Sequence, residues 1–269
     1  MKFNTYIPAK QLSGVVKFYW SLEGKIPSNE TYIHRTFANH CPELIFHYGG
    51  TFSELQTNDT IQSAFKTGIH GQTDRIRRFT AKKSCGIFGV IFQPYAIPIL
   101  FGISAKEVKN ELVDLSLLLG QDGLDISEKI ILADDNLSRK KIIDNYLKTL
   151  LRAEVKEAAI INTIHLISFA KGNVNIKSIS QQAYLSQRQF ERRFKDLTGF
   201  TPKSFSRLVR FKSLVENYQK TDFTLTEIAY DFGYYDQSHF IQEFKQFTGY
   251  SPKAYFDGRA VEVFYSPKQ

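Results

Sequence analysis

Two segments of this chain repeat one another at a spacing of 50 residues. The first reads "SQRQFERRFKDLTGFTPKSF" and spans residues 186–205; the second reads "DQSHFIQEFKQFTGYSPKAYF" and spans residues 236–256. A chain that carries one pattern twice is expected to fold both copies alike. The matched residues are Gln187, Phe190, Phe194, Lys195, Thr198, Gly199, Pro202 and Lys203 in the first copy and Gln237, Phe240, Phe244, Lys245, Thr248, Gly249, Pro252 and Lys253 in the second.

Each copy carries the signals of a helix with defined ends. Phe190 and Phe194 are four residues apart, so both face one side of a helix. Ser186 and Asp236 stand where N-cap residues belong. Gly199 suits the left-handed position after a helix, and Pro202 suits the first turn of the next one.

A shorter amphipathic segment precedes each copy, "IKSISQQAY" at 176–184 and "LTEIAYDFG" at 225–233. A short helix, a tight turn and a second helix with a polar outer face make a helix-turn-helix. The segment between the copies, 201–219, predicts one helix of about 18 residues and roughly 27 Å that holds the two units in a fixed relation. The inward positions expected on the short helices are Ile176, Ile179 and Ala183 in the first and Leu225, Ile228 and Ala229 in the second.

The outer faces of the repeated helices are rich in side chains that bond base edges and phosphates. Residues 170–256 hold 13 Lys and Arg against 8 Asp and Glu, whereas residues 1–150 hold 18 against 15. The concentrated positive charge favours a polyanionic partner. A duplicated helical scaffold without DNA binding is the alternative that the pattern leaves open.

The segment from about 175 to 256 resembles the DNA-binding domain of the AraC/XylS family of bacterial transcription regulators. The phrase "IAYDFGYYDQSHFIQEFKQFTGYSPKAYF" carries this resemblance. It implies two recognition helices on one face, joined by a long helix, that enter successive major grooves about 34 Å apart. The two copies then read the two halves of an asymmetric site without dimerisation.

The resemblance also assigns roles by position. It makes Arg192 the candidate for a bidentate contact to guanine and Glu191 an acceptor from cytosine. Members of the family often have a basic residue where Gln242 stands, so the second unit is expected to contribute less affinity or to read adenine. Lys203 and Lys253 are candidates for phosphate contacts. The full set of DNA-binding candidates is Ser186, Gln187, Arg188, Gln189, Glu191, Arg192, Arg193, Lys203, Gln237, Ser238, His239, Gln242 and Lys253.

The first hundred residues predict β structure, because short runs rich in Val, Ile, Phe and Tyr alternate with Gly, Pro and Asn. These runs are "GVVKFYWSLEG", "TYIHRTFANH", "PELIFHYGG" and "SCGIFGVIFQP", and helical spacing begins near Tyr95. The expected fold class is α+β. A β-rich barrel or sandwich with helices (1–152) precedes an all-α double helix-turn-helix domain (153–257), with unit 1 at 174–199, the linker helix at 201–219 and unit 2 at 224–249. A tail (258–269) follows.

The first half is the expected receiver of a regulatory signal, since "FANHCPELIFHYG" and "GVIFQPYAIPILFGIS" resemble the sensor domain of some family members. A small-molecule effector site is therefore open, with Phe18, Tyr19, Trp20, Phe46 and Tyr48 as lining candidates and core packing as their other role. His34, His40, Glu43 and His47 are ordinary metal-ligand types without tight ligand spacing, so we predict no metal and no cofactor.

Three further features each allow two interpretations. Cys41 and Cys85 are either a redox switch or buried small hydrophobic residues. The basic run at 73–84 is either a solvated loop or, as the competing idea, a second DNA-phosphate patch or a hairpin tip that meets the C-terminal domain. The apolar stripe of "SRKKIIDNYLKTLL" either pairs two subunits in a homodimer or packs inside the chain.

The expectation for function is a DNA-binding transcription regulator, an activator by family tendency, whose partners are promoter DNA and RNA polymerase. The chain shows no apolar run long enough for a bilayer and no leader pattern, and its two cysteines suit a reducing cytoplasm. No phosphate loop or nucleophile elbow is present, so no enzyme is expected. The alternatives are a cupin-like metal enzyme with a helical appendage and an adaptor that binds DNA without sequence preference.

Overall fold

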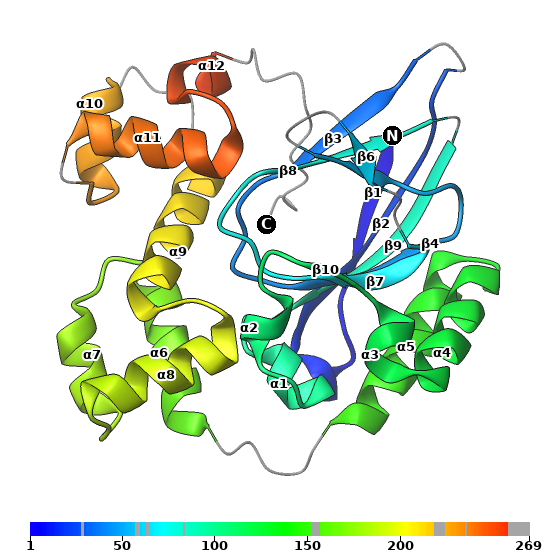
Figure 1. The fold of residues 1–269 in the computed structure, drawn as a ribbon, viewed down its shortest axis with the longest axis horizontal. Coiled ribbons are helices and arrows are strands. Elements are labelled where there is room, and N and C mark those ends of the chain that lie inside the picture. The colour runs from blue at the N-terminus through cyan, green and yellow to red at the C-terminus, as the bar shows by residue number, and fades with distance from the viewer. Residues whose placement is uncertain are drawn as a thin grey trace.

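The computed structural model has a β-rich part and an elongated helical part that lie side by side (Figure 1). The structure describes residues 1–27, 30–56, 60–62, 65–82, 84–151, 157–217, 224–234 and 236–257. The predicted domain boundary at 152–153, the last residues of the predicted linker helix and the tail at 258–269 lie outside the described residues, as does the side chain of Leu225.

Ten strands among the described residues form two antiparallel sheets. The larger sheet has the order β1 (Lys2–Tyr6), β2 (Val16–Lys25), β9 (Ser84–Phe92), β4 (Glu43–His47), β7 (Thr67–His70) and β10 (Leu112–Asp114). The smaller sheet has the order β3 (Tyr32–Thr36), β8 (Arg77–Ala81), β5 (Ser53–Leu55) and β6 (Ile61–Gln62). The four runs predicted as strands coincide with β2, β3, β4 and β9, although β2 ends one residue beyond its run, and the predicted α+β fold class is confirmed.

The central strands of the larger sheet are buried on both faces. In β4, Leu44 and Phe46 pack among the residues that face the helices, whereas Ile45 packs in the core between the two sheets. β9 follows the same alternation, with Phe88 on the helix side and Ile87 on the side of the smaller sheet. Side chains of a strand alternate between its faces, which explains why these runs are apolar throughout.

Short helices cover the outer face of the larger sheet. They are the 3₁₀ turn Lys10–Leu12, α1 (Ala96–Phe101), α2 (Ala105–Val108), α3 (Leu115–Leu119), α4 (Gln121–Leu132) and α5 (Asn136–Leu150). Asp144 of α5 fastens this layer, since its carboxylate accepts hydrogen bonds from the Tyr19 hydroxyl (2.7 Å) and the Ala9 amide (3.1 Å). None of the helices in the described part of the chain is long and apolar enough to cross a membrane.

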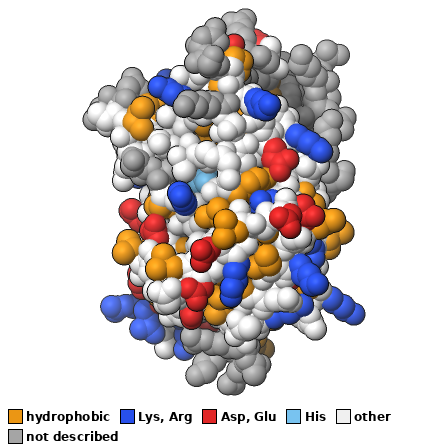
Figure 2. Space-filling view, turned by 90° about the vertical axis from the view of Figure 1, so that its right-hand side faces the viewer, with side chains coloured by type: hydrophobic (Ala, Val, Ile, Leu, Met, Phe, Trp, Pro, Cys, Tyr) orange, Lys and Arg blue, Asp and Glu red, His pale blue; other side chains and the backbone are white. Residues whose placement is uncertain are grey.

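The apolar stripe of α5 is used inside the chain. Ile143 and Leu147 are fully buried in the core between this helix and the larger sheet. The face formed by α3, α4 and α5 mixes apolar and charged side chains (Figure 2), with Leu124, Leu132 and Leu137 exposed. Core packing therefore accounts for the predicted stripe, and homodimerisation remains a prediction.

The helical part has a core of its own, rich in phenylalanine. It consists of α6 (Ala158–Phe169), α7 (Ile176–Gln182), α8 (Gln187–Thr198), α9 (Pro202–Asn217), α10 (Leu225–Asp231), α11 (Gln237–Thr248) and α12 (Pro252–Phe256). Phe37 and Ala38, which follow β3, and Tyr95 pack into the same core. The two parts of the molecule therefore share a hydrophobic interface.

The interpretation of the basic run at 73–84 as a solvated loop is wrong. Five of its residues form β8, in the interior of the smaller sheet. Arg77 forms an ion pair with Glu54 at 2.7 Å in which both side chains are largely buried, and Arg78 donates to the carbonyl of Gln56. The carbonyl of Asp74, just before β8, accepts from the side-chain amide of Gln246 in α11 at 3.4 Å. The interpretation that this segment meets the C-terminal domain therefore describes it better.

Candidate DNA-binding surface

The repeated segments form two helix-turn-helix units built in the same way. α7 and α8 make the first unit, α10 and α11 make the second, and α9 connects them. Gly199 and Gly249 end α8 and α11 with φ of 74° and 76°, the left-handed conformation expected of a glycine at this place. The described part of α9 has 16 residues and is therefore about 24 Å long.

The first helix of each unit fits against the second as its apolar positions predict. Ile179 and Ala183 of the first unit and Ile228 and Ala229 of the second are buried in the helical core, and Ile176 is partly buried against it. Phe190, Phe194, Phe240 and Phe244 are fully buried. The faces of α8 and α11 opposite these phenylalanines are left to solvent.

The N-terminal ends of α8 and α11 extend to the same side of the molecule, away from the β-rich part (Figure 1). Among the reading candidates on these helices, only Arg193 is half-buried. The exposed ones are Gln187, Arg188, Gln189, Glu191 and Arg192 on α8 and Gln237, Ser238, His239 and Gln242 on α11. Both helices thus present polar side chains that protein does not cover.

The candidates on α8 differ in whether their side chains already form ion pairs or hydrogen bonds with other residues. Arg188 and Arg192 lie one turn apart, and neither forms an ion pair with a described residue. Gln187 donates from its amide to the Glu191 carboxylate at 3.1 Å, which holds both along the helix. Arg193 turns away from this face and pairs with Glu157 at 3.5 Å. The two arginines with unengaged guanidinium groups are the strongest reading candidates of the first unit.

Two candidates of the first unit serve to start the helix. The Ser186 hydroxyl accepts from the Gln189 amide N–H, and the Gln189 side-chain oxygen accepts from the Ser186 N–H at 3.2 Å. This reciprocal pattern is a capping box, which satisfies two donors at the helix start. Ser186 and Gln189 therefore stabilise the start of α8, a role that the predicted contact with DNA did not include.

α11 presents a weaker electrostatic surface than α8. Gln237 accepts from the Thr226 hydroxyl at 3.2 Å, and His239 Nε2 lies 3.9 Å from the buried carboxylate of Glu243. Gln242 is exposed and makes no hydrogen bond with a described residue. The exposed side chains of α11 can donate and accept hydrogen bonds but bring less positive charge than those of α8.

The two phosphate-contact candidates occupy equivalent places. Lys203 is the second residue of α9 and Lys253 is the second residue of α12, and both are exposed. Each follows directly after a repeated unit, on the helix that leaves it. Their position agrees with the predicted role without testing it.

The opposite ends of both recognition helices rest on the β-rich part, which the sequence did not predict. The side-chain amide of Gln72, which is fully buried, donates to the carbonyls of Ala105 (2.8 Å) and Thr198 (2.9 Å). The Ala38 amide donates to the carbonyl of Phe247 at 3.0 Å. The C-terminal turns of α8 and α11 are thus held by the same domain.

The repeat extends into these contacts. Phe200 and Tyr250 are equivalent residues 50 positions apart, and each ring lies beneath a cation of the β-rich part. Lys109 Nζ lies 4.7 Å from the centre of the Phe200 ring, and the Arg35 guanidinium carbon lies 4.5 Å from the centre of the Tyr250 ring. Cation–π attraction of this kind contributes about 0.5–2 kcal/mol per pair.

Tyr184 of the first unit has a backbone conformation that the sequence pattern did not predict. It lies in the turn between α7 and α8 with φ of 55°, and its side chain is 96% exposed. When the units are aligned on Ile179 and Ile228, the equivalent residue is Gly233, whose φ is 70°. The second turn is one residue longer, so the first helices align at an offset of 49 residues instead of 50. This alignment places a glycine opposite Tyr184, which is the sequence signal for a left-handed residue at this position.

The four metal-ligand candidates do not come together. His40 packs on Phe205 at the interface with the helical part, whereas the rings of His34 and His47 pack on Phe52 between the sheets. In the part of the chain that the structure describes, no group of three His, Cys, Asp or Glu side chains is placed to hold a metal.

Three of the aromatic candidates for an effector site, Tyr19, Phe46 and Tyr48, have packing roles. Tyr19 and Phe46 are fully buried in the core beneath α5, and the Tyr48 ring lies 3.7 Å from the Arg139 guanidinium. Cys41 and Cys85 are both buried and unpaired, and burial raises the pKa of the Cys85 thiol. A thiol that is buried and kept protonated is a poor redox switch, so the packing interpretation fits Cys85 better.

Comparison with known proteins identifies the C-terminal architecture. A family model described as a helix-turn-helix domain matches residues 179–258. This part of the chain is an AraC-type helix-turn-helix domain. A second model, described as a domain of unknown function, matches residues 4–114, in front of the AraC-type domain. The search of curated proteins found no match to the chain.

Solved structures with an AraC-type domain resemble the chain only loosely. ToxT from Vibrio cholerae is 12% identical, with 89% of this chain and 98% of that chain covered and a TM-score of 0.48. The DNA-binding domain of AdpA, solved with a target DNA, is 23% identical over 37% of this chain and 91% of that chain, with a TM-score of 0.34. The xylose-binding activator XylR is 18% identical over 45% of this chain and 39% of that chain, with a TM-score of 0.34.

Proposed function

We propose that this protein is a sequence-specific transcription regulator that inserts α8 and α11 into successive major grooves of promoter DNA. The observation that carries the proposal is that α8 and α11, which α9 connects, extend their N-terminal ends to the same side of the molecule and expose polar side chains. Successive major grooves on one side of B-DNA are about 34 Å apart, a distance that one short helix does not span.

The two helices have different tasks in this proposal. Arg188 and Arg192 of α8 supply charge and bidentate donors that suit guanine, so the first unit carries most of the affinity. Gln237, Ser238, His239 and Gln242 of α11 are neutral or weakly basic and suit adenine or mixed contacts. Lys203 and Lys253 contact phosphates, which adds affinity without adding specificity.

The β-rich part is proposed to be the regulatory domain. It holds the C-terminal turns of both recognition helices through Gln72 and Ala38, so a change in its conformation would alter how the two helices are presented. Its signal would be a small-molecule effector, and the direction of regulation would be activation through RNA polymerase, as the resemblance to the family suggests. A cytoplasmic location follows from the same proposal.

The experiment that tests DNA recognition is selection of bound duplexes from a random pool by the full-length protein, followed by sequencing. The expected result is one motif with two unlike halves whose centres lie about one helical turn, 10–10.5 base pairs, apart. The selected duplex should bind at least about 10³-fold more tightly than random duplex. A ratio near one would favour the non-specific adaptor instead.

A further inference from the structure

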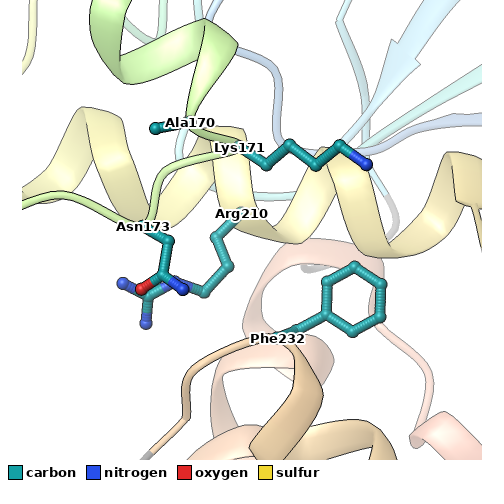
Figure 3. A pocket seen from close by; sticks show the side chains of 5 residues that line it. All are labelled: Ala170, Lys171, Asn173, Arg210 and Phe232. Atoms are coloured by element: carbon teal, nitrogen blue, oxygen red, sulfur yellow. The ribbon is translucent and has the colours of Figure 1, made fainter.

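A cleft of about 390 Å³ opens between the two helix-turn-helix units (Figure 3). The loop from α6 to α7 forms one wall, the end of α10 forms the other, and α9 lies at its base. Its lining residues are Ala170, Lys171, Asn173, Arg210 and Phe232. Both basic residues of the cleft lie outside the set of DNA-binding candidates derived above.

Arg210 joins the two units across this cleft. Its Nη1 donates to the carbonyl of Gly233 at 2.8 Å, and its Nη2 reaches the carbonyl of Gly172 at 3.4 Å. Its Nε is buried and has no hydrogen-bond partner among the described residues. Both acceptors are neutral carbonyls, and no carboxylate among the described side chains pairs with Arg210.

Lys171 is held at the rim by unusual backbone geometry. Its φ is 52° and that of the next residue, Gly172, is 78°, so two consecutive residues are left-handed. A side chain at Gly172 would meet the Ser206 carbonyl at 2.2 Å, so the loop lies directly on α9. A lysine in this conformation is strained, and such strain is typically retained at functional sites. Lys171 is exposed and forms no ion pair with any residue that the structure describes.

The cleft lies where the middle of the DNA site would be. Asn173 precedes Asn175, the N-cap of α7, by two residues, and the first helix of a helix-turn-helix crosses the DNA backbone. α8 and α11 flank the cleft, one in each unit. Between two major grooves on one side of the duplex lies a minor groove bordered by phosphates, which lysine, arginine and asparagine donors bind well.

We propose that this cleft binds the phosphate backbone of the DNA between the two half-sites, with Lys171 and Asn173 as its contact residues. Arg210 is a positioning residue that keeps the two walls together and makes the cleft electropositive. This inference rests on the proposed DNA-binding function and adds to it a central contact that does not depend on base sequence.

The test uses the full-length protein, the duplex recovered by selection, and phosphate ethylation interference combined with a salt titration. Wild-type protein should show interference at phosphates between the half-sites. Lys171→Gly should lose that central signal, bind all site variants several-fold more weakly, and lower the slope of log K against log salt by about 0.9. Because glycine adopts this φ without strain, the variant should unfold at the same or a higher temperature, so weaker binding would not reflect unfolding.

Lys129→Ala is the matched control, since it removes one exposed lysine from α4 in the β-rich part and should leave the slope unchanged. Absence of central interference in the wild type, or an unchanged slope in Lys171→Gly, would overturn the proposal. Either result would leave the DNA-binding function standing if the wild type still selects a two-part motif and Arg192→Ala weakens its binding.

Discussion

At the residue scale, the two units show how one fold takes on different roles at equivalent positions. Tyr184 and Gly233 occupy the same left-handed place in the two turns, and Arg193 and Glu243 occupy the same place in the two recognition helices with opposite charge. The buried phenylalanines are the same in both units, whereas Glu243 differs from Arg193 although it is buried, and its carboxylate is paired with Arg207.

Arg192→Ala should relax specificity at one base pair and weaken binding of the selected duplex by about 1–3 kcal/mol, if Arg192 makes a bidentate base contact. The measurement is titration against a panel of duplexes with every single substitution in the first half-site. Arg193→Ala is the control on the same helix, because its guanidinium already pairs with Glu157. A uniform loss over the whole panel for Arg192→Ala would move this residue to the phosphate-contact class.

Tyr184→Gly should raise the free energy of unfolding by about 1 kcal/mol, because glycine removes the strain of a left-handed tyrosine whose side chain makes no buried contact. Urea unfolding of the full-length protein measures this. Tyr230→Gly is the matched control, since Tyr230 is 61% exposed but lies in the helix α10. It should destabilise by about 0.5–1 kcal/mol, so the same substitution is expected to change sign between the two sites. A loss of stability in Tyr184→Gly would contradict the strain argument.

At the element scale, ion pairs anchor the two recognition helices in unequal ways. Glu243 of α11 is fully buried and pairs with Arg207 of α9, whereas the side chains of Arg193 of α8 and its partner Glu157 are partly exposed to solvent. Removing the partner of a buried charge is costly, whereas exposed pairs contribute little. We therefore expect the ion pair of the second unit to contribute more to stability than that of the first.

Arg207→Ala should accordingly lower the free energy of unfolding by about 3 kcal/mol, because Glu243 is left buried without its cation. Arg193→Ala, which breaks the exposed pair, should cost no more than about 1 kcal/mol. Thermal and urea unfolding of the two variants side by side measure the contrast. Equal effects would mean that Glu243 finds another partner or reaches solvent.

The packing of the two sheets makes a prediction about pH. Burial lowers the pKa of His34 and of His47 from 6.5 to about 4. Between pH 6.5 and about 4 the unfolded chain binds protons that these folded histidines do not. The free energy of unfolding should therefore decrease as the pH falls from 6.5 to about 4, by on the order of 3 kcal/mol for each residue. Burial raises the pKa of Glu43 to about 7. The folded protein therefore binds a proton at Glu43 that the unfolded chain does not, which should increase the free energy of unfolding as the pH falls from 7 to 4.5.

His47→Gln isolates the histidine contribution, because glutamine does not titrate. The variant and the wild type are compared by urea unfolding at pH 7.5, where the histidines are neutral in both states, and at pH 4.5. The stability difference between the two pH values should be smaller in the variant. An unchanged difference would show that His47 is protonated in the folded protein or that the sheets open before it titrates.

At the scale of the whole molecule, the contact between the β-rich part and both recognition helices determines how the DNA-binding surface is presented. Gln72 joins the end of α8 to α2, and Phe37 and Ala38 reach the core of the second unit. Each unit is therefore held from two directions, by α9 and by the β-rich part. Coupling of this kind is the physical route by which a signal in one domain would alter DNA binding in the other.

Gln72→Ala should lower the free energy of unfolding by about 1–3 kcal/mol, because the buried carbonyls of Ala105 and Thr198 lose their donor. It should also uncouple the unfolding of the two parts. The near-ultraviolet signals of the β-rich part and of the helical part should then no longer change at the same urea concentration. Gln121→Ala, at an exposed glutamine on α4 that bonds Asp125, should change stability by less than about 0.5 kcal/mol. A Gln72 variant as stable as the wild type would show that the interface does not depend on these bonds.

The sequence alone determined the double helix-turn-helix, its caps and the outward position of the reading residues. These follow from local rules, since a capping residue, a terminal glycine and two phenylalanines one turn apart act within a few residues of one another. It also indicated β2, β3, β4 and β9, whose apolar runs are long enough to recognise. The basic segment that contains β8 was not recognised, because Arg77 is paired with a residue 23 positions away.

Only the tertiary structure decided the relations between distant segments. It turned Arg193 toward Glu157, placed the Arg35 and Lys109 cations over Tyr250 and Phe200, and opened the cleft beside Lys171 and Arg210. These contacts join residues that are far apart along the chain, with packing and charge shared between domains. A one-dimensional pattern records which side chains are available, but their partners are set by three-dimensional packing.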